Sequence, residues 1–324
     1  MTKQRTYRIR NWKEYNRSLI NRGNITIWFS DEARNKWTAR KTGARGRPRI
    51  YSDEAILCAL VVKAVYHLSL RSLQGFLTSL ICLLGLPLSV PSYCQICRRA
   101  SCLGATLKRL SGNRRITDIV IDSTGLKVYG EGEWKVRTHG KSKRRTWRKA
   151  HLAICPDSHI VSLALLTDNS TTDSEAFEEM ADYLPRSVKR AYGDGAYDRS
   201  GTYKKSRGRG ILLISPPQNG AVLHNVATEP WMSDRNEAIR VITGLGDDDT
   251  ARSLWKKLMG YHRRSLAETG MFRLKTLFGG ALSSRKLSRQ RAEFLAKATA
   301  MNRMTSLGMP KGIWMEKEDR QLIT

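Results

Sequence analysis

The spacing of apolar residues changes near residue 115, and this change limits the folds that are open to the chain. Upstream of it, Ser52–His67 carries apolar residues at a 3.6-residue period behind a Ser-Asp-Glu start, which is typical of a helix. Two further helical segments follow, at Leu70–Leu84 and Tyr93–Lys108. From Ile116 onward the period falls to two, which indicates β-strands. The pattern therefore predicts a helical region followed by an α/β region.

The order of elements after residue 115 narrows the prediction to one α/β fold. Three strands come first, then a helix that starts at a Thr-x-x-Glu capping box, and then strand, helix, strand and a last long helix. This is the order of a ribonuclease-H-like α/β fold. The strands are expected at Ile116–Ile121, Trp147–Cys155, Ile160–Thr167, Val188–Asp194 and Ile211–Ser215, and the two best-marked helices at Ser174–Leu184 and from about Thr250 to Phe278, with a break near Gly260.

The net charge indicates the class of partner. The 324 residues include 57 Lys and Arg against 29 Asp and Glu, a formal charge of +28. A polyanion neutralises such a charge and gains affinity through counterion release, whereas a small-molecule enzyme gains nothing from the self-repulsion. The longest apolar runs, Ala55–Val62 and Leu80–Val90, are too short to span a membrane, and the basic N-terminus lacks the apolar stretch of a secretory signal. We therefore expect a cytoplasmic protein that binds nucleic acid.

Six cysteines without an export signal favour a reducing compartment. Cys94, Cys97 and Cys102 could form part of a zinc site, but no second Cys-x-x-Cys or His pair follows at the spacing of a zinc finger. We interpret them as thiols on helices.

Two dense basic segments are candidates for contacts with DNA. The first contains a Gly-Arg-Pro core, which suits an arm in an A·T-rich minor groove but equally suits a basic linker. The second, Trp134–Lys149, has eight Lys or Arg and no acidic residue, and is either a DNA-contacting loop, which we favour, or a solvated hairpin. The expected contact residues are Arg45, Arg47, Arg49, Lys143, Arg144, Arg145, Arg148 and Lys149.

Two aspartates at predicted strand ends are candidates for metal-dependent chemistry. Asp122 ends the first strand in Val-Ile-Asp-Ser-Thr-Gly, and Asp194 ends the fourth between two glycines that would allow close approach of a phosphate. An aspartate that caps a turn would look the same in the sequence. Asp198 is a rival for Asp194, but we expect it to cap the next helix, just as Asp247–Asp249 are expected to cap the helix that follows them.

A third acid, Glu268, lies in the spaced motif Tyr261-x2-Arg264-x3-Glu268-x6-Lys275. On one continuous helix, these offsets would place all four side chains within roughly 60° of one face. The stripe is either the salt-bridged, solvated face of an ordinary helix or a carboxylate that completes a site together with two phosphate-binding cations.

The motif, together with Asp-Ser-Thr-Gly and Asp-Gly-Ala-Tyr, resembles bacterial insertion-sequence transposases of the DDE superfamily. The N-terminal Asn-Trp-Lys-Glu-Tyr-Asn and Gly-Arg-Pro-Arg-Ile-Tyr-Ser segments are similar to the insertion-sequence-five family in particular. The resemblance implies a catalytic triad of Asp122, Asp194 and Glu268, with Tyr261, Arg264 and Lys275 as accessory residues. The hard carboxylate oxygens suit two Mg²⁺ ions, with Mn²⁺ as a substitute.

The resemblance also implies an organisation and a set of partners. We expect a basic arm at residues 1–50, a mainly helical domain for DNA binding or dimerisation at 51–115, and a catalytic domain at 116–324. The partners would be double-stranded DNA, both the element's terminal inverted repeats and its target, and a second copy of the chain once assembled on DNA.

Three other functions are compatible with parts of the pattern. A DNA-binding regulator without catalysis would be favoured by a missing acid, but none of the three is missing. A tyrosine recombinase needs an Arg…His-x-x-Arg…Tyr arrangement, which the chain lacks around His262. A nuclease of the same fold would differ only in the absence of strand transfer.

Overall fold

The computed structural model describes residues 5–29, 31–40, 43, 46, 48–104, 109–112, 114–128 and 147–316. Most of the predicted basic loop lies outside these ranges. So do five of the predicted DNA-contact residues, namely Arg45, Arg47, Lys143, Arg144 and Arg145.

The first hundred residues are mainly helical, as the apolar period predicts. Three helices form the part that packs on the rest of the molecule: α4 (Asp53–Val65), α5 (Leu70–Leu83) and α6 (Tyr93–Leu103). Each helix follows a serine whose hydroxyl accepts the backbone N–H of the residue three positions later. Because serine is a preferred N-cap, the sequence could predict where these helices begin. Helix α6 ends at Leu103, with Gly104 as its C-cap, earlier than the period suggested.

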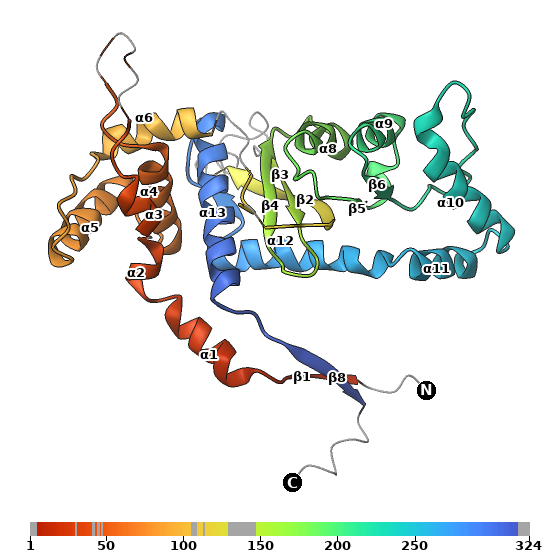
Figure 1. Ribbon diagram of the computed structural model, residues 1–324, viewed down its shortest axis with the longest axis horizontal. Helices are drawn as coiled ribbons and strands as arrows, with labels where there is room; N and C mark the ends of the chain where they lie inside the picture. Colours follow the sequence, from red (N-terminus) through yellow and green to blue (C-terminus); the bar gives the residue numbers. More distant parts are fainter. Residues whose placement is uncertain are drawn as a thin grey trace, which may run out of the picture.

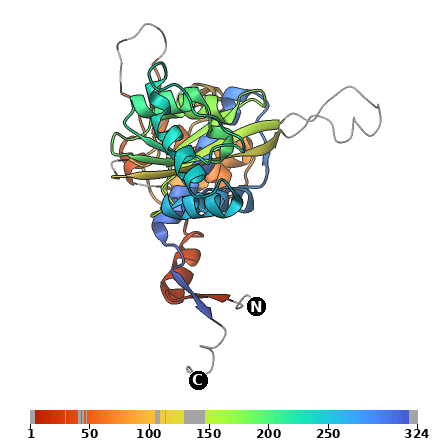
Figure 2. The ribbon, with the colours of Figure 1, turned by 90° about the vertical axis from the view of Figure 1, so that its right-hand side faces the viewer.

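The basic N-terminal segment carries structure that the sequence did not reveal. It contains a short strand and three helices, β1 (Arg5–Ile9), α1 (Trp12–Asn21), α2 (Ile25–Trp28) and α3 (Asp31–Asn35). Strand β1 pairs antiparallel with β8 (Gly312–Glu316) at the other end of the chain. Figures 1 and 2 show this two-stranded ribbon and α1 projecting from the rest of the molecule.

The remainder is an α/β unit built on one mixed sheet, which agrees with a ribonuclease-H-like fold. Its path is β4-β3-β2-β5-β6, with a short strand β7 also paired to β2. The pairs β2–β3 and β3–β4 are antiparallel, whereas β5 and β7 run parallel to β2 and β6 runs parallel to β5. The strands are β2 (Asp118–Val128), β3 (Trp147–Ile154), β4 (Val161–Thr167), β5 (Arg190–Tyr192), β6 (Leu212–Ile214) and β7 (Ala281–Leu282).

Strand β2 is longer than predicted, and this changes the position of Asp122. The strand continues to Val128, because its second half pairs with β3 on one side and β7 on the other. Asp122 is therefore in the middle of the strand rather than at its end, opposite Leu152 of β3.

Both faces of the sheet are buried, and successive residues of β2 alternate between them. Ile119 and Ile121 join a core formed with α8 (Asp173–Ala181) and the segment around α9 (Ser200–Gly208). Val120 joins a larger core on the opposite face, formed with α12 (Ser265–Phe278) and α13 (Leu287–Leu307). The predicted capping box at the start of α8 is confirmed.

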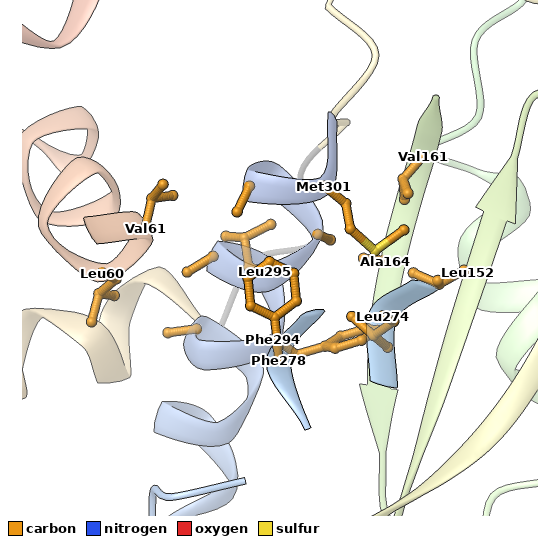
Figure 3. Close-up of a cluster of buried hydrophobic side chains, with 14 of the residues drawn as sticks. Leu60, Val61, Leu152, Val161, Ala164, Leu274, Phe278, Phe294, Leu295 and Met301 are labelled. Atoms are coloured by element: carbon orange, nitrogen blue, oxygen red, sulfur yellow. The ribbon is translucent and has the colours of Figure 1, made fainter. Parts of the chain in front are cut away.

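Helix α13 lies between the N-terminal helices and the sheet. Figure 3 shows Leu295 and Met301 of α13 between Leu60 and Val61 of α4 and Val161 and Ala164 of β4, which are labelled there with further members of the same core. The N-terminal helices and the α/β unit are therefore packed through one continuous hydrophobic core.

The last predicted long helix is broken at Gly260, as expected. After η2 (Pro230–Met232) and α10 (Ser233–Gly244), helix α11 (Asp249–Leu258) starts behind Asp248, whose side chain caps it. Gly260 adopts the left-handed conformation, a 3₁₀ turn η3 (Tyr261–Arg264) follows, and α12 then begins at Ser265. Among the described residues no single helix is long and apolar enough to cross a membrane, although α4 and α5, bent by 108°, pass that test as a pair.

Burial of His151 on β3 gives a prediction for stability. The side chain is buried, with 1 % of its surface exposed, and lies beside Thr167, Asp173 and Lys149. Burial lowers the pKa of His151 to about 4, even though the Asp173 carboxylate 3.6 Å away raises it. Between pH 6.5 and 4 the unfolded chain thus binds a proton that the folded chain does not, so the free energy of unfolding falls as the pH falls.

We expect this loss to total on the order of 3 kcal/mol and to shrink in His151→Gln, as measured by urea denaturation at pH 7 and pH 4.5. His262→Gln, at an exposed position of η3, is the control. Equal pH dependence in the wild type and in His151→Gln would contradict the assignment.

Candidate active site

Three carboxylates from three separate elements converge on the guanidinium of Arg264. Its Nη2 lies 3.5 Å from Asp122 Oδ1 and 3.5 Å from Asp194 Oδ2, while its Nη1 donates a hydrogen bond to Glu268 Oε1. The structure therefore brings together the three acids singled out in the sequence and one of their accessory residues.

Asp122 is the most enclosed of the three acids, with its side chain 15 % exposed. It points to the same face of the sheet as Val120, toward α12, and its Oδ1 accepts the backbone N–H of Ser123 at 2.9 Å. Burial raises the pKa of Asp122, and the charges of Asp194 and Glu268 raise it further, while Ser123 and Arg264 oppose the shift. The pKa of Asp122 would fall if a further cation bound there.

Asp194 follows strand β5 at a tight turn. Its side chain caps the 3₁₀ turn η1 (Gly195–Tyr197) by accepting the N–H of Ala196 at 2.9 Å, and Ser215 holds its carbonyl at 2.6 Å. A Cβ at Gly193 would lie 2.6 Å from the Tyr197 ring, so glycine is required there for packing of the ring. The role that the sequence predicted for the two glycines, close approach of a phosphate, stays a prediction, and Gly195 borders an open pocket.

Glu268 lies in the first turn of α12 and is 59 % exposed. Because Tyr261 and Arg264 belong to η3, the predicted single helical stripe is wrong in detail, although Arg264 still reaches Glu268. Tyr261 packs against Trp255 at a ring distance of 6.5 Å, and burial raises its pKa to about 12. Lys275 is exposed, two turns farther along α12, and its side chain has no hydrogen bond or ion pair with the described residues.

A buried carboxylate that sequence reasoning missed fixes the elements that carry these acids. Asp118, at the start of β2, accepts hydrogen bonds from Arg190 of β5 at 2.6 and 2.9 Å and from Arg263 of η3 at 2.6 Å. Arg263 also reaches Asp157 in the β3–β4 turn at 2.6 Å. Burial alone would raise the pKa of Asp118, but the hydrogen bonds and charges of Arg190 and Arg263 outweigh it and lower the pKa. The only signal in the sequence was a charged residue at the head of an apolar strand.

The carboxylate oxygens of Asp122, Asp194 and Glu268 are suitable ligands for a hard divalent cation, although the three side chains are too far apart to bind a single ion. Carboxylate oxygens are the ligands that Mg²⁺ prefers. Within the described ranges, no three His, Cys, Asp or Glu side chains are close enough to share one metal ion. The guanidinium of Arg264 accounts for this spacing, since it contacts Glu268 through one nitrogen and both aspartates through the other.

Comparison with protein families identifies the family of the chain. Two family models, both described as transposase DDE domain, match residues 20–131 and 113–303. The second match covers more than half of the chain and contains Asp122, Asp194 and Glu268. The chain belongs to the DDE transposase family. DNA is therefore its class of substrate, and recombination of DNA its class of reaction.

The transposase uses Asp198 differently from what the sequence suggested. Helix α9 has no side-chain cap. Instead, Asp198 forms a buried ion pair with Arg235 of α10, at 2.8 and 3.3 Å, and accepts further hydrogen bonds from Tyr203 and the Gln218 N–H. The prediction that Asp198 caps the following helix is wrong, because the long-range partner on α10 was invisible in the local sequence.

The predicted DNA-contact residues that are described lie in different settings. Arg49 is exposed. Arg148 and Lys149 belong to strand β3, where Arg148 binds Gln290 at 2.9 Å and Lys149 lies 3.6 Å from Asp173. Part of their bonding capacity is thus already used within the protein.

The predicted cysteine cluster lies on one helix. Cys94, Cys97 and Cys102 are free thiols of α6, and the described residues contain no group of three potential metal ligands around them.

The Asp198–Arg235 pair predicts a structural phenotype. Asp198→Leu should lower the free energy of unfolding by about 3–5 kcal/mol, because it leaves the Arg235 charge buried without a partner. The double variant Asp198→Leu/Arg235→Met should recover part of that loss in urea denaturation. A single variant as stable as the wild type would show that the ion pair contributes nothing.

Proposed function

We propose that the transposase binds the terminal inverted repeats of its own insertion sequence and catalyses metal-dependent strand cleavage and strand transfer. The observation that carries this proposal is the convergence of Asp122, Asp194 and Glu268 on one site. The three acids come from β2, the turn after β5 and α12, and they meet at one guanidinium, so separate elements of the fold bring them to one place.

The three carboxylates would hold two Mg²⁺ ions, or Mn²⁺ as a substitute. Such a pair of ions, when bound, activates the attacking water or DNA 3′-OH and stabilises the leaving oxygen. The chain itself supplies the negative charge that attracts the ions, with Asp122 held from the side of the sheet and Glu268 from α12. No side chain has to act as a covalent nucleophile.

Arg264 and Lys275 would bind phosphates of the substrate beside these acids. Arg264 offsets part of the charge of the three carboxylates, and its guanidinium could bind a phosphate of the substrate at the same place. Tyr261, packed on Trp255, would hold η3 in position. The basic segments around Arg49 and Trp134–Lys149 would contact the DNA backbone away from the site.

The finer assignment rests on the sequence motifs. They support a bacterial member of the insertion-sequence-five family that acts near the nucleoid, as a homodimer assembled on DNA. In this proposal, residues 1–50 form a basic arm, residues 51–115 recognise DNA or form the dimer, and residues 116–324 carry the chemistry.

Glu268→Gln tests the enzymatic proposal. The substitution keeps the shape and the hydrogen-bonding capacity of the side chain but removes the charge that a divalent ion requires. We expect cleavage and strand transfer in Mg²⁺ to fall by orders of magnitude, while DNA binding and the thermal unfolding midpoint stay near the wild-type values.

Glu237→Gln is the matched control, since Glu237 is 68 % exposed on α10 and paired to an arginine one turn away. It should cut and join DNA at the wild-type rate. If Glu268→Gln also did so, Glu268 would be no more than part of a surface ion pair. Cleavage without strand transfer in the wild type would instead indicate a nuclease.

A further inference from the structure

A cavity of about 630 Å³ lies where the N-terminal helices meet the α/β unit. Its wall is formed by α4, α6, the end of α12, β7 and the first half of α13. Leu60 of α4 and Phe278 of α12, both labelled in Figure 3, belong to it. None of the proposed catalytic residues lines this cavity.

The cavity is lined by an excess of positive charge. One ion pair is internal: Lys297 lies 3.3 Å from Glu293, and both side chains are buried. Glu293 also accepts the backbone N–H groups of Ser283 and Ser284, at 3.0 and 2.9 Å. Among the described residues, this carboxylate is the only acidic side chain of the lining. Lys297 and the two backbone N–H groups already occupy its oxygens.

Three further cations line the same cavity, and all three lack an ion pair among the described residues. Lys63 donates a hydrogen bond to the Ser283 hydroxyl at 3.3 Å, and Arg289 donates one to the Ser101 hydroxyl at 3.2 Å. Arg285 is exposed, and its side chain has no hydrogen bond with any described residue. Neutral hydroxyls orient Lys63 and Arg289 without cancelling their charge, and the one carboxylate that Lys63 also faces, Glu293, is already paired with Lys297. An anion entering the cavity would therefore meet four cations against one carboxylate.

Helix α12 connects this cavity to the proposed catalytic site. Glu268 lies in its first turn and Phe278 is its last residue, which corresponds to about 15 Å along the axis. Lys275 lies between them, on the same face as Glu268 and exposed. At 3.4 Å per phosphate of one strand, 15 Å corresponds to about four nucleotides.

We propose that this cavity binds the phosphate backbone of the DNA substrate, about four nucleotides from the bond that is cut, through Lys63, Arg285 and Arg289. The binding of DNA here rests on DNA being the substrate of the family, and only the spacing of about four nucleotides rests on the proposed function of Glu268. The site would clamp DNA between the N-terminal helices and the α/β unit. Contact with phosphates would make it independent of base sequence.

The salt dependence of DNA binding tests this site. The double variant Lys63→Gln/Arg289→Gln should bind a 40-base-pair duplex of arbitrary sequence more weakly. The slope of log affinity against log salt concentration should be smaller in magnitude by about 1.8, at roughly 0.9 per lost phosphate contact. If the double variant does not fold, Arg285→Gln, which breaks no contact with the described residues, should still reduce the slope by about 0.9.

Arg186→Gln/Lys189→Gln is the matched control. Both residues are exposed cations just ahead of β5, and Lys189 contacts Thr117 just ahead of β2, whereas β7 and the cavity are at the far end of β2. The control should leave the slope within error of the wild type. If both double variants lowered the slope equally, the cavity residues would contribute no more than any other surface charge, and the proposal would be wrong. An unchanged slope in Lys63→Gln/Arg289→Gln would also overturn it.

Native cysteines provide a test of position. Cys97 lines the cavity, whereas Cys82, an exposed thiol near the end of α5, does not. Duplex DNA should slow the modification of Cys97 by N-ethylmaleimide several-fold more than that of Cys82, as read by peptide mass spectrometry. The difference should disappear in Lys63→Gln/Arg289→Gln. Protection of Cys97 by inorganic phosphate but not by DNA would exclude a DNA-binding role.

Glu268→Gln separates this inference from the enzymatic proposal. A cavity that binds DNA should protect Cys97 equally in Glu268→Gln, whether or not that variant retains activity. Loss of protection in Glu268→Gln would overturn the cavity proposal while leaving the role of Glu268 open.

Discussion

The carboxylates of Asp122, Asp194 and Glu268 repel one another, and the architecture around them has to compensate for that repulsion. Two unit charges about 4 Å apart interact by roughly 1 kcal/mol in water and about 4 kcal/mol near a protein surface. Arg264 supplies the compensation by contacting all three acids at once. The same repulsion, together with burial, raises the pKa of Asp122 and makes the site attractive to further cations.

To bring the three acids to Arg264, the elements β2, β5 and η3 must keep fixed positions relative to one another. Asp118 holds them there. Its buried carboxylate joins the start of β2 to Arg190 of β5 and Arg263 of η3. Asp122 lies four residues farther along β2, Asp194 two residues beyond the end of β5, and Arg264 directly after Arg263. One structural ion-pair cluster at the base of the sheet thus sets the geometry of the proposed catalytic cluster.

Helix α13 gives the molecule a second organising feature. It packs on the sheet and on α4 within one core, so the N-terminal helices are an integral part of the transposase and not a separate body on a linker (Figure 3). The basic cavity lies along this junction, where DNA held by both parts would be clamped. The β1–β8 ribbon likewise pairs a strand before the N-terminal helices with a strand after α13 (Figure 1).

The sequence by itself determined the class of fold, the starts of α4, α5, α6 and α8 and the break at Gly260, because periodicity and capping residues are local signals. Its motifs also singled out the three acids that meet at Arg264. It did not show the length of β2, the pairing of β1 with β8, or the partners of Asp118 and Asp198. Those depend on contacts between residues far apart in the chain: Asp198 looked like a helix cap until Arg235 of α10 was placed beside it. The motif predicted Arg264 near Glu268, but only the tertiary structure showed that its guanidinium contacts all three acids, because Gly260 and η3 turn it toward β2 and β5 before α12 begins.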